Sequence, residues 1–184
     1  MERCSGSTLD WDPRATLKWD QRFLQRAFLT ASWSKDPRHR VGCVVVDDQR
    51  NELSGGFNGF PRGVIDDGRL QDRDAKLKII VHAEANAIAA AARNGHSLKG
   101  GILYCTLTPC PQCASLIIQS GIERVVIPLE DPGKQHENRT YWIEAGRFAI
   151  NLLQEAGVKV GRVPLGDWGP FLDFLLAETP KNEG

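Results

Sequence analysis

The 184-residue sequence has no net charge, because 23 Lys and Arg residues balance 23 Asp and Glu residues. A protein whose main role is to grip polyanionic nucleic acid would carry a basic excess, so no nucleic-acid partner is expected. No stretch approaches the roughly 18 consecutive apolar residues of a membrane-spanning helix, and no membrane partner is expected. The N-terminus also lacks the apolar core of a signal peptide, which favours a cytoplasmic protein.

Cysteine is too scarce for a disulfide framework: the chain has five. Two of them, Cys110 and Cys113, form a C-x-x-C motif, and this usage suits a reducing compartment. Cys43 and Cys105 lie in apolar, strand-like runs and Cys4 lies near the N-terminus, so we interpret these three as inert thiols.

The candidate metal ligands and an acid–base residue lie in two short segments, His82-Ala83-Glu84 and Pro109-Cys110-Pro111-Gln112-Cys113. One imidazole and two thiols are ligands that zinc prefers, and three ligands leave the fourth tetrahedral position open, as catalytic zinc sites require. Glu84 is close enough in sequence to His82 to handle protons at the same metal. The combination H-x-E…P-C-x-x-C is typical of zinc-dependent deaminases, in which the Glu is the acid–base group and not a ligand.

Two other interpretations of these residues remain. A C-x-x-C pair that opens a helix after a strand also fits a redox pair, but that interpretation leaves His82 and Glu84 without a role. A core histidine, two incidental cysteines and a surface glutamate would have no function at all. The order of the residues, with helical patterns after both motifs, favours the zinc site over both alternatives.

Apolar periodicity and turn residues predict five helices and five strands in one domain. The expected helices are 17–33, 82–93, 110–120, 140–156 and 168–177, and the expected strands are 41–46, 52–57, 101–107, 122–128 and 158–163. A helix between the last two strands implies a parallel pair. The prediction is an α/β domain over 17–178, with a five-stranded mixed sheet covered on both faces, a flexible arm 1–16 and a tail 179–184.

Two further segments lie between these elements. The glycine-rich stretch 55–63 predicts a shaped loop, because it holds several glycines and a proline among aromatic residues. The run 66–78 is dense in charges of both signs, which indicates a solvated face for most of it, although Arg69, Arg73, Lys76 and Lys78 could still meet a phosphate.

Four segments resemble the cytidine deaminase superfamily and, within it, the deoxycytidylate (dCMP) deaminases. They are Ser34-Lys35-Asp36-Pro37 with Val41-Gly42, the loop G-F-N-G-F-P-R-G at 56–63, H-A-E-A-N-A-I at 82–88, and Tyr104-Cys105-Thr106 leading into the C-x-x-C motif. The glycine loop ahead of H-A-E is the most discriminating of the four. Phe57 departs from the family pattern, since tyrosine is more usual there, and the match is weak beyond about residue 128.

The resemblance implies a three-layer α/β/α fold and the hydrolysis of dCMP to dUMP and ammonia, which would supply dUMP for thymidylate synthesis. It implies His82, Cys110 and Cys113 as zinc ligands and Glu84 as the proton shuttle. Some relatives hold a second, structural zinc through extra Cys or His residues ahead of the H-A-E motif. None lies between Cys43 and His82, so one zinc per chain is expected.

The resemblance also implies a set of substrate contacts. Asn58 matches by position the asparagine that meets the sugar. An aromatic such as Phe57 or Phe60 would line the base pocket, unless these rings only pack the loop, and Arg62 and Ala83 complete the expected set. One or two cations would hold the 5′ phosphate. The candidates are Lys35, Arg38, Arg40, Arg62, Arg73 and Lys76.

Family members are often homohexamers, and many are activated by dCTP and inhibited by dTTP. We therefore expect a homo-oligomer, a hexamer by resemblance, with magnesium accompanying a nucleoside triphosphate effector. The alternatives are another deaminase of the superfamily, acting on modified dCMP, a nucleoside, guanine or tRNA adenosine, or a catalytically silent nucleotide-binding protein. Neutral charge argues against tRNA, and Glu84 beside an open zinc position argues against a silent protein.

Overall fold

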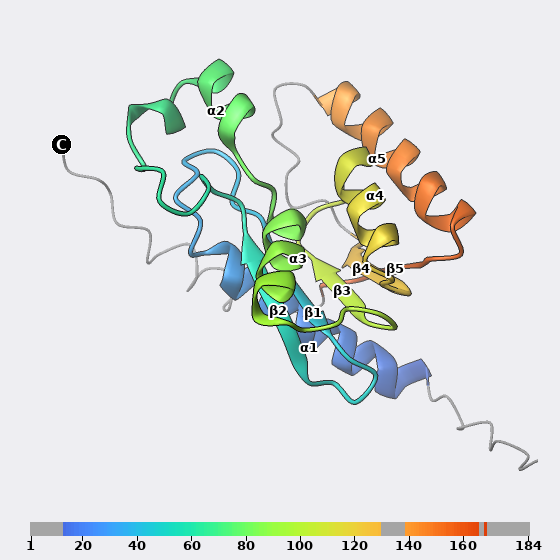
Figure 1. Ribbon diagram of the computed structural model, residues 1–184. Coiled ribbons are helices and arrows are strands. Elements are labelled where there is room, and N and C mark those ends of the chain that lie inside the picture. Colours follow the sequence, from blue (N-terminus) through green and yellow to red (C-terminus); the bar gives the residue numbers. More distant parts are fainter. Residues whose placement is uncertain (1–12, 130–138, 166–167, 169–184) are drawn as a thin grey trace, which may run out of the picture.

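The computed structural model describes residues 13–129, 139–165 and 168. These form a five-stranded sheet in the order β2-β1-β3-β4-β5 (Figure 1). The strands are β1 (Gly42–Val46), β2 (Glu52–Phe57), β3 (Ile102–Cys105), β4 (Arg124–Pro128) and β5 (Lys159–Val163). β1 pairs antiparallel with β2 and β3, whereas the β3–β4 and β4–β5 pairs are parallel. The predicted mixed sheet of five strands is confirmed.

Helices cover both faces of this sheet, which gives the three expected layers (Figure 1). Helix α1 (Pro13–Ala31) lies on one face, while α3 (Ala83–Asn94), α4 (Pro111–Gln119) and α5 (Arg139–Glu155) form the other layer. A short 3₁₀ turn, Gly68–Leu70, and helix α2 (Arg73–Ile79) lead into α3. No helix in the described ranges is long and apolar enough to cross a membrane.

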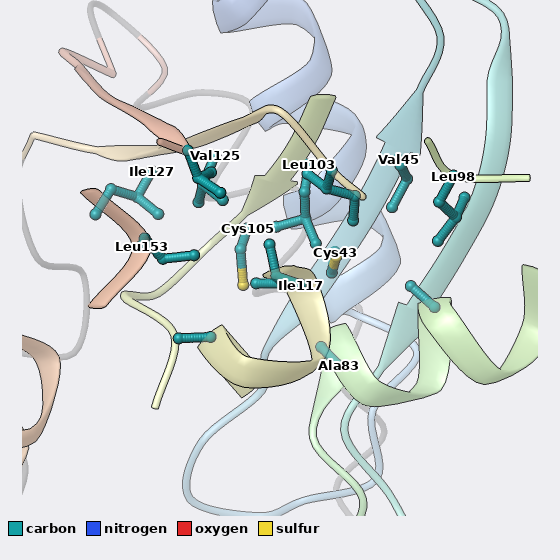
Figure 2. Packing of buried hydrophobic residues seen from close by; sticks show 14 of the residues in the cluster. Cys43, Val45, Ala83, Leu98, Leu103, Cys105, Ile117, Val125, Ile127 and Leu153 are labelled. Atoms are coloured by element: carbon teal, nitrogen blue, oxygen red, sulfur yellow. The ribbon is translucent and has the colours of Figure 1, made fainter. Parts of the chain in front are cut away.

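The continuous apolar run of β1 follows from burial on both faces. Cys43 and Val45 belong to the hydrophobic cluster beneath α3, α4 and α5, whereas Val44 and Val46 pack with α1. Figure 2 shows Cys43, Val45 and residues of β3 and β4 packed against α3 and α4. Alternate residues of a strand point to opposite faces, so a strand covered twice has no polar side.

Glycine allows α3 to lie directly on the sheet. A Cβ atom at Gly56 of β2 would lie 2.5 Å from both the carbonyl oxygen of Ala83 and the backbone nitrogen of Ala87. Ala83, Ala87 and Ala91 of α3 are buried against the sheet, and their small side chains permit the same close approach. The start of α3 is therefore fixed relative to the end of β2.

Two predictions about the chain need correction. α1 begins at Pro13 and not at Leu17, so residues 13–16 of the predicted arm are helical. The charged run 66–78 is exposed over most of its length, as expected, but it was given no regular element and it folds as the 3₁₀ turn and α2, which buries Lys76. The rest of the predicted arm, the tail and the terminal helix, apart from Trp168, lie outside the described residues. The domain limits therefore remain a prediction.

Candidate active site

The N-termini of α3 and α4 bring the predicted zinc ligands together. His82 is the N-cap residue of α3, and Cys110 is the N-cap residue of α4, where Pro111 occupies a favoured first position. Cys113 lies in the first turn of α4, and its backbone N–H donates to the Cys110 sulfur at 3.5 Å. His82 Nδ1 lies 3.4 Å from Cys110 Sγ and 3.5 Å from Cys113 Sγ.

These distances fit a tetrahedral zinc ion. Zinc–sulfur bonds of about 2.3 Å and zinc–nitrogen bonds of about 2.0–2.1 Å place a nitrogen and a sulfur ligand about 3.5 Å apart at a tetrahedral angle. All three ligand atoms lie within 4.8 Å of one another. The three side chains can therefore hold zinc with little rearrangement, and the nitrogen that faces the sulfurs is Nδ1.

The protons of the ligand group are distributed unevenly. A hydrogen bond from the Cys113 thiol, with a further contribution from His82, lowers the pKa of Cys110 to about 4. The same hydrogen bond, together with burial, raises the pKa of Cys113. The hydrogen bond to Cys110 raises the pKa of His82 against the effect of burial. Because zinc binds thiolates and neutral imidazole, its binding would release the proton held on Cys113.

Glu84 lies beside this group in the first turn of α3, and the residue is 4% exposed. Burial raises the pKa of Glu84, and His82 and the backbone of α3 offset only part of that shift. A raised pKa makes a carboxylate a better proton acceptor than an ordinary glutamate while leaving it able to return the proton. Position and burial therefore suit Glu84 for acid–base work next to the zinc ligands.

The glycine loop is hydrogen-bonded to the segment that leads into the candidate zinc ligand His82. Gly59 and Val81 exchange two backbone hydrogen bonds, of 3.1 and 2.9 Å, and Val81 immediately precedes His82. Asn86 of α3 donates from its side chain to the carbonyl oxygen of Phe57 at 2.7 Å. Loop residues that would contact a substrate are thus held beside the zinc ligands, although they lie far from Cys110 and Cys113 in the sequence.

Asn58 is the most constrained of the expected substrate residues. It is 5% exposed. Its Nδ2 group donates to His39 O at 2.8 Å and to Asp36 Oδ2 at 3.3 Å, and its Oδ1 accepts from Val41 N at 2.8 Å. Both donor hydrogens therefore have partners inside the protein, and one acceptor position on Oδ1 remains.

The other expected substrate residues differ in exposure. Phe57 is 36% exposed and packs edge-on against Trp33. Phe60 is partly buried, with the Arg69 guanidinium 5.5 Å from its ring centre. Ala83 is fully buried against strand β2, so only its backbone could approach a ligand. The Arg62 side chain is exposed.

The structure shortens the set of candidate phosphate cations. Lys76 forms a buried ion pair with Asp36, and Lys35 forms an ion pair of 2.7 Å with Asp66. Among the described residues, Arg40, Arg62 and Arg73 form no ion pair. Two of the predicted cations are therefore already neutralised by carboxylates.

Sequence reasoning missed the polar network that joins Ser34, Asp36 and Lys76 to Asn58. Ser34 Oγ donates to the carbonyl oxygen of Asn58 at 2.7 Å, and Lys76 Nζ donates to both carboxylate oxygens of Asp36. The Ser-Lys-Asp-Pro segment contributed to the resemblance, but the pattern gave Ser34 and Asp36 no contact and assigned Lys76 and Asn58 to the substrate, not to each other's network.

An open α/β sheet with a His/Cys/Cys set and a buried glutamate at two helix N-termini defines a zinc-binding deaminase domain. The chain belongs to the cytidine and deoxycytidylate deaminase family, whose zinc-binding region matches residues 17–129.

Several relatives extend this assignment. The chain is 41% identical over 149 residues to the "Uncharacterized deaminase in luxG 3'region" of Aliivibrio fischeri, with 80% of this chain and 95% of that protein covered. It is 40% identical over 116 residues to the deoxycytidylate deaminase of Homo sapiens, with 60% of this chain and 64% of the human protein covered. Among solved structures, it is similar to the apo dCMP deaminase of cyanophage S-TIM5, with a TM-score of 0.61, 27% identity, and coverage of 83% of this chain and 100% of that chain. The complex of the same enzyme with dCMP and dUMP aligns with a TM-score of 0.59 at 26% identity, covering 83% of this chain and 99% of that chain.

Proposed function

We propose that this protein catalyses the zinc-dependent hydrolysis of dCMP to dUMP and ammonia. The observation that carries the proposal is the site itself: His82 Nδ1 lies 3.4 and 3.5 Å from two cysteine sulfurs, and the buried Glu84 lies beside them. The human and cyanophage relatives named above support dCMP as the substrate. The product dUMP would then be available for thymidylate synthesis.

His82, Cys110 and Cys113 would hold one zinc ion, which when bound supplies a water molecule of lowered pKa. Glu84 accepts a proton from the attacking water and delivers it to N3 of the cytosine ring. The water oxygen adds at C4, and Glu84 then moves the remaining proton of that hydroxyl group to the amino group, so that the C4–N bond breaks, ammonia leaves and C4 becomes a carbonyl. One carboxylate can serve both transfers because it is regenerated, and its raised pKa suits both directions.

We propose that the loop residues bind the rest of the nucleotide. The free acceptor position of Asn58 Oδ1 suits a sugar hydroxyl group, since a hydroxyl can donate to it. Phe57 or Phe60 would contact the base, and the backbone of Ala83 lies between the metal ligand and the acid. Arg62 would bind the phosphate, because its exposed guanidinium forms no ion pair among the described residues.

The decisive experiment compares dCMP with deoxycytidine and cytidine on zinc-loaded protein by ammonia release. Two charge-assisted hydrogen bonds to the phosphate, at roughly 1.5–3 kcal/mol each, correspond to a preference of about 10²–10⁴ for the monophosphate. We expect kcat/KM for dCMP to exceed that for deoxycytidine at least about a hundredfold. Comparable values would move the protein to the nucleoside deaminases.

We also propose a homo-oligomer, a hexamer by resemblance, that is activated by dCTP with magnesium, inhibited by dTTP, and cytoplasmic. The family resemblance is the support for these points. Light scattering measures the oligomer, and initial rates with each triphosphate measure regulation. Hyperbolic kinetics that neither triphosphate changes would contradict the regulatory part alone.

A further inference from the structure

A buried ion pair outside the zinc group has no role in the chemistry above. Lys76 Nζ of α2 donates to Asp36 Oδ2 at 2.9 Å and to Oδ1 at 3.1 Å, and the two side chains are 8% and 2% exposed. In the Lys35–Asp66 pair, by contrast, the lysine side chain is 70% exposed. Burying two charges is unfavourable unless further hydrogen bonds compensate for the lost water. The other partners of Asp36 therefore indicate what the pair holds in place.

Asp36 fixes the turn that leads into β1. Its Oδ1 accepts from the backbone N–H groups of Arg38 and His39 at 2.9 and 3.0 Å, and its own N–H donates to Ser34 Oγ at 3.2 Å. One carboxylate thus sets the backbone of residues 36–39. Arg40, a candidate phosphate cation, follows directly.

The same carboxylate ties this turn to the glycine loop through Asn58. Asn58 Nδ2 donates to Asp36 Oδ2 and to the carbonyl oxygen of His39, while its Oδ1 accepts from Val41 N. The backbone N–H of Asn58 donates to Val41 O at 3.1 Å as well. The turn 36–41 and the loop 57–62 are consequently held as one unit, which we name the substrate-side unit.

Two routes connect the ion pair with His82. In the first, Asn58 is followed by Gly59, which exchanges two backbone hydrogen bonds with Val81, the residue before His82. In the second, Lys76 lies in α2, and the N–H of Ile80 caps that helix by donating to Lys76 O at 2.8 Å. Figure 1 shows α2 next to the start of α3. Lys76 is therefore attached to the chain segment that leads directly into the zinc site.

We infer that the Lys76–Asp36 ion pair is a positioning device that sets the substrate-side unit against the zinc ligands without touching substrate or metal. The ligands and Glu84 are held separately, because α3 and α4 pack on the sheet through Ala83, Ala87, Ala114 and Ile117. Loss of the pair would displace the groups that bind the nucleotide and leave the proton chemistry intact. The inference rests on the proposed function only for the choice of dCMP as the assayed substrate.

The test is the Lys76→Met variant, which keeps most of the aliphatic chain and removes the charge. We expect KM for dCMP to rise about tenfold or more, since small misplacements of positioning groups have large effects. We expect kcat to change less than about threefold, because ground-state placement and not transition-state chemistry is lost. Zinc content should stay at one per chain, and Lys76→Arg should restore most of the lost affinity.

Arg26→Met is the matched control. It also removes a long side chain from an ion pair between distant segments, because Arg26 of α1 pairs with Glu52 at the opposite end of β2 from Phe57. Arg26→Met should leave both kcat and KM unchanged. If either variant merely loses stability, the fraction of folded enzyme falls, which lowers the apparent kcat and leaves KM unchanged.

Hydrogen exchange without substrate separates this inference from the proposed function. In Lys76→Met, amides in 36–41 and 57–62 should exchange faster, while those in 83–94 keep the wild-type rate. Unchanged exchange, or a fall in kcat or zinc content without a rise in KM, would overturn the positioning role. Faster exchange in a protein whose wild type does not deaminate dCMP would overturn the substrate assignment instead.

A double variant covers the case in which Lys76→Met fails to fold. Asp36→Asn combined with Lys76→Met leaves no unpaired buried charge, so it should fold where the single variant does not. It should show the same rise in KM and the same faster exchange. Wild-type KM and exchange in the double variant would count against the inference.

Discussion

The zinc end of the molecule, by which we mean His82, Glu84, Cys110 and Cys113, and the substrate-side unit are built in different ways. The zinc ligands lie at or near the N-caps of two helices, so each ligand is placed by the element that begins at it. Apart from Phe57 at the end of β2, the substrate-side unit lies outside helices and strands, and it is shaped by side-chain hydrogen bonds between Asp36 or Asn58 and backbone groups. The candidate zinc ligands are thus positioned by secondary structure and the expected substrate-binding residues by a polar network, so mutations in the two regions should have different effects.

Loss of a zinc ligand should have the largest effect. Cys110→Ser removes a thiolate but keeps a good N-cap residue, so α4 should persist. We expect bound zinc to fall well below one per chain and activity to reach background, because a three-ligand site cannot spare a ligand. Metal analysis and ammonia release measure both.

Cys43→Ala is the control for that variant. It changes a buried thiol that is not part of the ligand group and should retain zinc. A Cys110→Ser protein that keeps its metal would contradict the assignment of the zinc end.

Glu84→Gln should come next, with a loss of turnover on the order of 100-fold or more, as expected for a positioned acid–base group. Zinc content and nucleotide binding should stay normal, because Glu84 is not a ligand and the amide keeps the shape of the side chain. Binding of dCMP followed by calorimetry separates the two quantities. A near-normal rate would remove Glu84 from the chemistry.

Gly56→Ala tests whether the close packing of α3 on β2 holds both the zinc end and the substrate-side unit in place. The new methyl group would meet backbone atoms of Ala83 and Ala87 at 2.5 Å, so α3 must move away from β2. Overpacking of this kind typically destabilises by about 1–3 kcal/mol, and the shift of α3 should also lower kcat.

Gly68→Ala is the matched control for Gly56→Ala. Nothing lies within 4 Å of a Cβ atom at Gly68, and its φ is not positive. Urea unfolding of both variants measures the difference. Equal stability of the two would show that α3 tolerates displacement from the sheet.

Arg62→Met should have the smallest effect and concerns the substrate-side unit alone. Loss of one charge-assisted contact, about 1.5–3 kcal/mol, predicts a fall of about 10- to 100-fold in kcat/KM for dCMP. Deoxycytidine serves as the internal control, because it has no phosphate and its rate should not change. An equal fall for both substrates would mean that Arg62 supports the loop and does not bind phosphate.

The sequence predicted the zinc end well because its signals are local. A histidine and a C-x-x-C pair each precede a helical pattern, and the structure places His82 and Cys110 at the two N-caps. The strands were equally readable, since burial on both faces requires a continuous apolar run such as Gly42–Val46. The start of α1 was misplaced because the four residues from Pro13 have no clear apolar period, yet they are helical.

The sequence by itself predicted the five strands, the mixed sheet and the candidate zinc ligands with Glu84, because apolar runs and the two short motifs are local signals, but it missed the 3₁₀ turn and α2. Only the tertiary structure decided which polar side chains are free to meet a ligand. Lys76 and Arg62 look alike as candidate cations, but Lys76 is buried on Asp36 and Arg62 is exposed. The physical reason is distance along the chain: residues 36, 58 and 76 meet only after the sheet and helices have formed, and no local pattern encodes that contact.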